Sequence, residues 1–295
     1  MWVIFALFSA LGLGFYDVVK KLSLRANNVL LVLLLNTVFS TLLMSPVLAG
    51  NLMAGSFGLG DSVRGHLLII VKAVIVLSSW LLGYFSIKHL PLTIQGPVNA
   101  TRPVLVLLGA LLIFGERLNA LQWCGILLGF ASLYLVSRIG AREGFSIRSS
   151  RWLWMAGGAT MLGAVSALYA KYLLGLYRPL EVQAWYSLYQ CIIMSTAIVV
   201  MRRTHPEAAG VATAFTWRWT IPCISLFLTL ADLAYFYSLS LDGAMISIVS
   251  MIRRGSVLVS FAYGVIVLHE RNVRAKLADL SILLISLILL VLGSE

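Results

Sequence analysis

Residues 91–117 read PLTIQGPVNATRPVLVLLGALLIFGER, and the interpretation of the whole chain starts from this stretch. Its first half carries Gln95, Asn99 and Arg102 at helical spacing, which places the three side chains on one helix face. Its second half is apolar and ends in the Gly-Glu-Arg sequence of residues 115–117. We expect one membrane-spanning helix over residues 91–114 that is polar on one side of its first half.

A similar pattern of polar and apolar residues occurs at residues 243–271, GAMISIVSMIRRGSVLVSFAYGVIVLHER. The polar side chains of this second copy come first, and its apolar part again ends in a Glu-Arg pair. The two glutamates, Glu116 and Glu270, are 154 positions apart in a chain of 295 residues. A polar half-helix that recurs in each half of a hydrophobic protein indicates a transport site between two repeats.

The composition is that of a membrane protein. Hydrophobic residues make up 60% of the chain and charged residues 11%, whereas soluble domains carry about 25% charged residues. Apolar runs of about 20 residues, the length that crosses about 30 Å of hydrocarbon, recur from end to end. The net charge is +11, but most basic residues lie in short links between the apolar runs. This distribution is typical of membrane topology signals, so we expect a multi-pass protein of the cytoplasmic membrane that binds no nucleic acid.

We expect ten membrane-spanning helices, over residues 2–20, 28–48, 67–88, 91–114, 119–137, 152–174, 181–201, 218–241, 243–268 and 275–293. A basic link at 138–151 separates a first five-helix repeat (1–137) from a second (152–295). A repeat with an odd number of spans must be inverted in the membrane relative to its twin. The predicted fold class is an all-α integral membrane protein with ten transmembrane helices as two inverted five-helix repeats.

Two five-helix repeats, each with a fourth helix that ends in Glu-Arg, resemble the EamA-type transporters of the drug/metabolite transporter superfamily. The first copy carries the resemblance in residues 103–118, PVLVLLGALLIFGERL; the second has Val257 in place of the proline and His269 in place of the glycine. The resemblance covers essentially the whole chain and implies a transporter fold. It also implies that the termini face the cytoplasm, whereas the basic links favour both termini outside.

Charged side chains inside the predicted spans are the main candidates for a site. A charge at mid-bilayer costs at least about 2.5 kcal/mol unless it faces a cavity, a partner or the interface. Arg102, Arg253 and Arg254 are the strongest candidates, because the planar guanidinium group suits a carboxylate or a phosphate. Asp232 is expected either to pair with one of these arginines or to take part in proton coupling.

Polar and aromatic side chains nearby complete the predicted substrate site. Gln95 and Asn99 are expected to orient the substrate through hydrogen bonds. Aromatic residues at span ends are often interface anchors, but some of those in this chain lie deeper. The complete predicted substrate-binding set is Trp80, Gln95, Asn99, Arg102, Tyr189, Gln190, Asp232, Tyr235, Arg253 and Arg254.

Four other charged residues are interpreted as structural. Asp17 and Lys20 lie three residues apart near the end of the first predicted helix and are expected to pair at the interface. Lys72 lies near the start of the third predicted helix, and Lys171 near the end of the sixth. Both lysines are expected to extend their side chains to the interface.

Catalytic and cofactor-binding motifs are not evident. The sequence has no phosphate-binding loop, no H-E-x-x-H pair and no C-x-x-C pair. Cys124, Cys191 and Cys223 lie in apolar runs and are expected to be buried free thiols. We therefore expect no enzyme activity, no metal and no cofactor.

These features predict a secondary-active transporter that moves a small anionic metabolite by alternating access between two inverted repeats. Its expected partners are the substrate, the lipid bilayer and a coupling ion, which is a proton or a counter-substrate. Gly125 and Gly129 form a G-x-x-x-G pattern that predicts close helix packing and permits at most a weak homodimer. The alternatives are a flippase for an anionic lipid carrier, an exporter of amino acids or drugs, and a non-transporting membrane scaffold.

Overall fold

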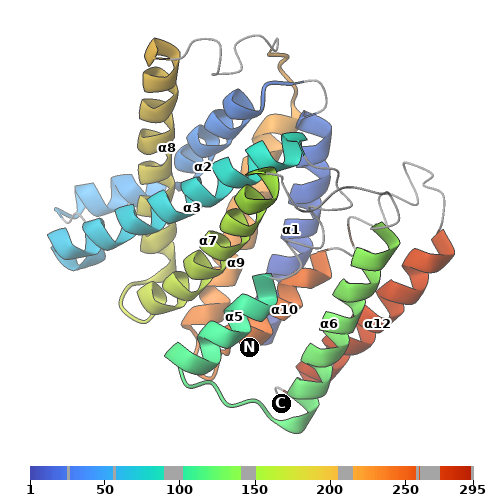
Figure 1. Cartoon of the computed structure of the whole chain (residues 1–295). Helices are drawn as coiled ribbons and strands as arrows, with labels where there is room; N and C mark the ends of the chain where they lie inside the picture. Colours follow the sequence, from blue (N-terminus) through green and yellow to red (C-terminus); the bar gives the residue numbers. More distant parts are fainter. Residues whose placement is uncertain are drawn as a thin grey trace.

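A computed structural model describes residues 1–24, 27–55, 58–89, 102–140, 151–204, 215–256, 259 and 273–293. All regular structure in these residues is helical (Figure 1). The first half of the chain forms α1 (Trp2–Leu24), α2 (Val29–Met53), the 3-10 turn η1 (Leu59–Asp61), α3 (Val63–His89), α5 (Arg102–Ile113) and α6 (Ala120–Gly140). The second half forms α7 (Arg151–Leu174), α8 (Pro179–Thr204), α9 (Thr220–Ser240), α10 (Ile246–Ile252), the 3-10 turn η3 (Arg253–Gly255) and α12 (Val273–Leu292).

Most helices lie where the hydropathy pattern predicts them, and the differences have local causes. The third helix begins at Val63, four residues before the predicted start, so Arg64 and His66 lie in its first turn. The helix predicted to begin at residue 243 begins at Ile246, after a turn in which Gly243 has a φ of +75°. The predicted helix over 91–114 is confirmed from Arg102 onward; its start lies outside the described residues.

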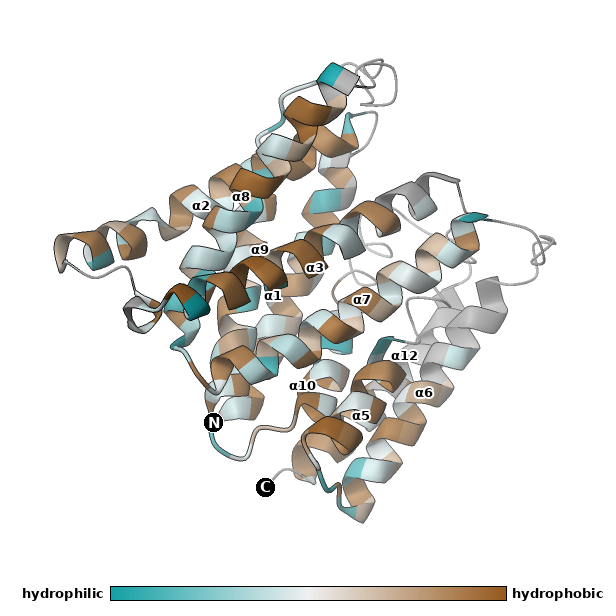
Figure 2. Cartoon of the chain, turned by 60° about the vertical axis from the view of Figure 1, so that its left-hand side comes forward, coloured by the Kyte–Doolittle hydropathy of each residue, from teal (hydrophilic) through white to brown (hydrophobic). Residues whose placement is uncertain are grey.

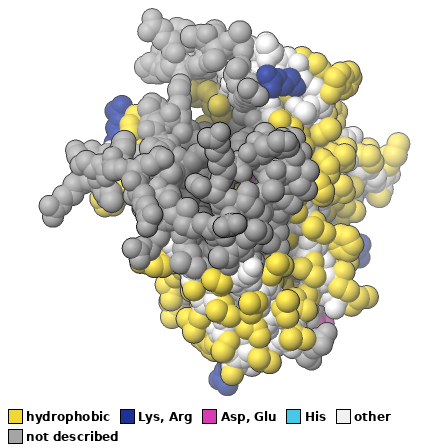
Figure 3. Space-filling view, turned by 90° about the vertical axis from the view of Figure 1, so that its right-hand side faces the viewer, with side chains coloured by type: hydrophobic (Ala, Val, Ile, Leu, Met, Phe, Trp, Pro, Cys, Tyr) yellow, Lys and Arg dark blue, Asp and Glu magenta, His cyan; other side chains and the backbone are white. Residues whose placement is uncertain are grey.

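Six of the described helices are long and apolar enough to cross a membrane: Trp2–Lys20, Val29–Met53, Val63–Gly83, Arg151–Leu174, Pro179–Met201 and Thr220–Ser240. Hydrophobic residues recur along the helices in Figure 2, and hydrophobic side chains cover much of the described surface in Figure 3. Large apolar side chains such as Leu112, Trp154 and Trp219 are exposed on the outside. An apolar outer surface of this kind suits contact with lipid, and the chain is an integral multi-pass membrane protein.

Helix packing follows the proposed repeat. α1 packs along α9 and α3 packs along α7, while α2 pairs with α8 and α6 pairs with α12 (Figure 1). If α7, α8, α9 and α12 repeat α1, α2, α3 and α6, the first two pairs are one contact made twice. The remaining two pairs each join a helix of the first half to its counterpart in the second half. The two-repeat arrangement stays a prediction, and this packing supports it.

The contacts at the end of α9 show that α1 and α7 run in opposite directions. The Ser238 hydroxyl, near the end of α9, donates to the carbonyl of Trp2 at the start of α1 (2.8 Å). The Lys171 ammonium, near the end of α7, donates to the carbonyls of Leu239 (3.1 Å) and Ala244 (2.5 Å). The Lys171 ammonium thus bonds to carbonyl acceptors of the turn after α9, and its predicted extension to the interface stays a prediction.

The α6–α12 pair confirms the close packing predicted from Gly125 and Gly129. The Ser286 hydroxyl donates to the carbonyl of Gly125 at 2.6 Å, and a Cβ on Gly125 would lie 2.8 Å from the Leu290 side chain. Among the described residues, α6 packs mainly against α12. Cys124 on α6 is exposed, so its predicted burial is wrong; Cys191 and Cys223 are half-buried.

Candidate functional site

A cavity of about 460 Å³ lies between the two halves of the chain. α1, α3 and α5 line it from the first half, and α7, α8, α9, α10 and η3 line it from the second. This volume falls in the range of small-molecule sites, which is about 300–1,000 Å³. The described residues therefore place a chamber where the sequence predicts a site between repeats.

Basic side chains outnumber acidic ones in the described lining. The basic residues are Lys20, Lys72, Arg102, Arg253 and Arg254, and the acidic residues are Asp17 and Asp232. The lining thus carries five basic and two acidic groups, an excess of three positive charges. Uncompensated charge is costly in a low-dielectric surrounding, so this composition favours entry of an anion.

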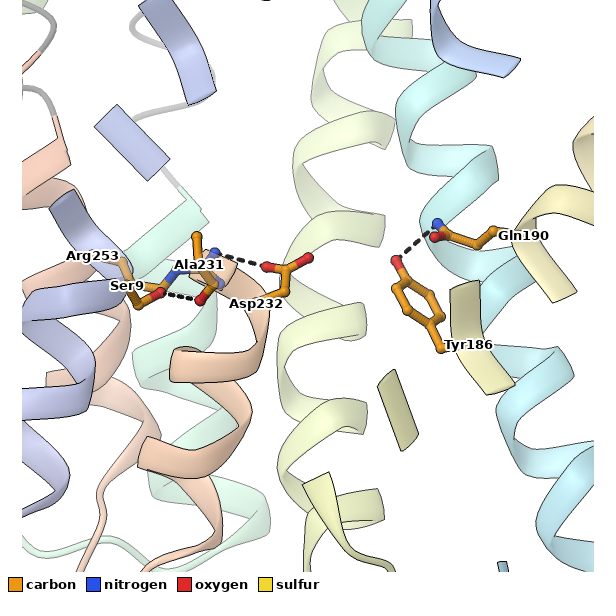
Figure 4. A network of polar contacts seen from close by, with 6 residues as sticks. All are labelled: Ser9, Tyr186, Gln190, Ala231, Asp232 and Arg253. Carbon is orange, nitrogen blue, oxygen red and sulfur yellow. Dashed lines mark hydrogen bonds and ion pairs between the residues drawn. The ribbon is translucent and has the colours of Figure 1, made fainter. Parts of the chain in front are cut away.

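The predicted pairing of Asp232 with an arginine is confirmed. The Arg253 Nη2 donates to Asp232 Oδ1 at 3.0 Å, and both side chains are less than one-fifth exposed (Figure 4). The guanidinium carbon of Arg253 also lies 4.2 Å from the centre of the Tyr235 ring, which holds the guanidinium plane by a cation–π contact. The Nε of Arg253 is buried and has no hydrogen-bond partner among the described residues. The pair therefore uses only part of the donor capacity of Arg253.

Arg102 reaches the cavity from the first residue of α5. Its guanidinium lies directly against Gly163 on α7, where a Cβ would overlap it. The absence of a side chain at Gly163 gives the guanidinium its place across the cavity from α5. Arg254 lines the same cavity from η3, so all three predicted arginines are brought together.

Lys72 is a cavity residue that the sequence interpretation missed. It is only 3% exposed, so the prediction that it extends to the interface is wrong. Its ammonium lies 5.0 Å from the ring centre of Tyr186 and 4.9 Å from that of Phe236. Because α3 begins at Val63, Lys72 lies about 14 Å along the helix from its start rather than near it. A predicted helix start at residue 63 would have placed Lys72 within the span and identified it as a candidate cavity residue.

Asp17 and Lys20 belong to the cavity lining as well. The Lys20 ammonium lies 5.1 Å from the centre of the Tyr16 ring. The predicted place of Asp17 and Lys20 at the interface is wrong, because both residues line the cavity. The packing of α1 along α9 places this part of α1 at the chamber.

The remaining predicted site residues divide into three groups. Trp80 and Tyr235 line the cavity. Gln190 and Tyr189 do not: the Gln190 amide donates to the Tyr186 hydroxyl at 2.8 Å (Figure 4), and the Tyr189 hydroxyl lies 2.9 Å from Nδ1 of His66. Gln95 and Asn99 lie outside the described residues. Gln190 thus acts behind the cavity wall, where it positions Tyr186.

Two backbone anchors fix the helices that carry these groups. The Ser9 hydroxyl on α1 donates to the carbonyl of Ala231 on α9 at 2.7 Å, one residue before Asp232 (Figure 4). On the other side of the cavity, the Ser79 hydroxyl on α3 donates to the carbonyl of Ala159 on α7 at 2.7 Å. Both bonds join a first-half helix to a second-half helix. Within the described part of the chain, no group of three or more His, Cys, Asp or Glu side chains is arranged to hold a metal.

Comparison with known proteins agrees with this architecture. A solved crystal structure shares 17% sequence identity with the chain and superposes with a TM-score of 0.70, covering 99% of this chain and 94% of the other. That likeness shows a shared fold. No protein of curated function matches the chain. Residues 1–138 match the EamA-like transporter family. The matched stretch includes the helix that ends in Gly-Glu-Arg, so the first part of the chain is similar to the EamA-like transporters of the drug/metabolite transporter superfamily.

Proposed function

We propose that the protein is a secondary-active transporter that moves a small anionic metabolite by alternating access between its two halves. The observation that carries this proposal is the cavity between the halves, with its described lining of five basic and two acidic side chains. Three of the basic groups are arginines, which bind carboxylate and phosphate groups through parallel N–H donors.

Contributions from both halves suit a mechanism in which the halves move relative to one another. Arg102 approaches the substrate space from α5, whereas Arg253 and Arg254 approach it from η3, directly after α10. α5 and α10 contact each other, and they are the corresponding helices in the predicted two-repeat arrangement. A substrate held by both is released when they separate, and this coupling of binding to movement is the requirement of alternating access.

Uptake by the purified protein in liposomes tests the proposal. The substrate panel contains anionic, cationic and neutral metabolites, and the variants are Arg102→Gln and Arg254→Gln. Arg64→Gln is the matched control, because Arg64 is exposed at the start of α3 and does not line the cavity. We expect uptake of an anion that both cavity variants reduce at least about tenfold and the control leaves unchanged.

Two outcomes would contradict the proposal. Uptake of cations or neutral amino acids that both cavity variants leave intact would make the arginines structural and favour an exporter of amino acids or drugs. Movement of an anionic lipid between leaflets, without uptake of any soluble anion, would favour a flippase.

A further inference from the structure

Lys72 has unused hydrogen-bonding capacity inside the cavity. An ammonium group has three N–H donors and no acceptor. Among the described residues, the Lys72 ammonium makes no hydrogen bond or ion pair, and it lies 5.0 Å from the ring centre of Tyr186 and 4.9 Å from that of Phe236. Ring faces attract a cation but do not replace oxygen acceptors. Lys72 is 3% exposed, and its ammonium has no hydrogen-bonding partner in the part of the chain that the structure describes.

Asp232, an acidic group of the same cavity, is already paired with another residue. Asp232 forms its ion pair with Arg253 at 3.0 Å, and no ion pair between Asp232 and Lys72 occurs in the described residues. Arg253 itself keeps a buried Nε–H donor without an acceptor among those residues. Two cationic groups, one from each half of the chain, therefore line one cavity with donors that the described protein atoms do not satisfy.

The position of Lys72 is fixed before any ligand binds. Gln190 donates to the hydroxyl of Tyr186 at 2.8 Å, which holds the Tyr186 ring in place. The Phe236 ring, from α9, holds the ammonium from a second direction. A lysine is normally flexible, so a lysine held between two ring faces is preorganised and loses little entropy when it binds an anion.

We propose that Lys72 is a specificity-determining substrate contact, which selects a substrate with two negative charges, such as a dicarboxylate or a phosphate monoester. The inference rests on the proposed function, because it assumes that the cavity binds an anion. A substrate with one charge, bound by the arginines, leaves Lys72 without an acceptor. A second charge provides that acceptor and also offsets more of the three-charge excess of the described lining.

Binding measurements with matched pairs of anions test this inference. The probes are succinate with monomethyl succinate, and glycerol 3-phosphate with its methyl diester, used at slightly alkaline pH because the second pKa of a phosphate monoester is about 6. The wild-type protein should bind the doubly charged member of at least one pair about tenfold more tightly, and the pair that it prefers distinguishes carboxylate from phosphate. Lys72→Met should bring the ratio of the two dissociation constants close to one. Lys72→Arg should retain most of the preference for the doubly charged member.

The results that overturn the inference differ from those that overturn the proposed function. An unchanged ratio in a folded Lys72→Met protein, or a wild-type preference for the singly charged members, would contradict the inference and leave anion transport standing. Binding of neutral or cationic compounds in place of all four probes would contradict both.

Reductive methylation of the wild-type protein provides a test that needs no variant. Mass spectrometry follows the methylation of Lys72, with Lys171 as an internal reference because its ammonium is bonded to the carbonyls of Leu239 and Ala244. The doubly charged member of the preferred pair should slow methylation of Lys72 relative to Lys171, and the singly charged member should not. Equal methylation of Lys72 with and without the doubly charged probe would overturn the inference.

Discussion

The carboxylate of Glu116 accepts a hydrogen bond of 2.6 Å from the backbone amide of Ile246, although 130 residues separate them in the chain. The same carboxylate accepts from the amide of Ser247 at 3.2 Å and from the Ser247 hydroxyl. Glu116 belongs to the Gly-Glu-Arg sequence that follows α5, and Ile246 begins α10. The glutamate that follows α5 in the first half thus caps the start of α10 in the second half.

Glu116→Gln should destabilise the protein. An amide keeps the shape of the side chain but loses the charge, and a hydrogen bond to a charged group contributes about 1.5–3 kcal/mol. We expect the free energy of unfolding to fall by about that amount, seen as a lower melting temperature of the purified protein. Arg117→Gln is the control, because Arg117 is the next residue and is exposed. Equal melting temperatures for Glu116→Gln and the wild type would show that the cap contributes nothing.

Lys171→Met should loosen the turn between α9 and α10. The methionine keeps most of the length of the side chain but removes both hydrogen bonds, to the carbonyls of Ala244 (2.5 Å) and Leu239 (3.1 Å). The test uses a protein whose three native cysteines have been replaced and in which Ala244, a buried residue, is changed to cysteine. This new cysteine should react faster with a water-soluble thiol reagent when Lys171→Met is also present. Asp242→Cys, at an exposed position of the same turn, is the reference and should react equally in both backgrounds. Faster labelling at both positions would mean general unfolding, and no change at position 244 would rule out a role for Lys171 in closing this turn.

Gly163→Ala should reduce anion uptake with little effect on stability. The new Cβ would overlap the guanidinium of Arg102, and a long flexible side chain moves away at small cost. The arginine then leaves its place in the cavity, so uptake should fall about tenfold while the melting temperature stays close to that of the wild type. Gly157→Ala on the same helix is the matched control, because nothing lies within 4 Å of a Cβ there. Equal uptake by the two variants would show that the position of Arg102 on Gly163 is unimportant for transport.

Asp232→Asn should make the protein more dependent on bound anions. The substitution removes the charged partner of Arg253, so we expect the free energy of unfolding to fall by about 1–3 kcal/mol. This loss is smaller than for a fully buried ion pair, because both side chains are partly exposed. An anion that occupies the place of the carboxylate should recover part of this loss. The measurement is the rise in melting temperature on adding succinate or inorganic phosphate, which should be larger for Asp232→Asn than for the wild type. Asp242→Asn, at an exposed position, is the control. An equal rise in the variant and the wild type would mean that the freed guanidinium binds no anion.

Much of the membrane architecture follows from the local sequence. Apolar runs of about 20 residues specify helices whatever their neighbours are, because a backbone in lipid must satisfy its own hydrogen bonds. The spacing of polar residues within those runs identified Arg102, Arg253 and Arg254, which the fold brings to one cavity. Asp232 was also identifiable, because a carboxylate within a span requires a partner and the arginines on the next predicted helix are the nearest candidates.

The roles of the other charged residues depended on tertiary structure. Lys72 is a cavity residue because Tyr186 of α8 and Phe236 of α9 surround it, and Lys171 is a structural contact because the turn after α9 lies beside α7. The same packing places Tyr189 against His66 and outside the cavity. Hydropathy and helical period determine which residues form a span and which face of it is polar. Only the contacts between distant helices decide whether a polar face meets a cavity, a carbonyl or another side chain, since those contacts join residues that no local pattern relates.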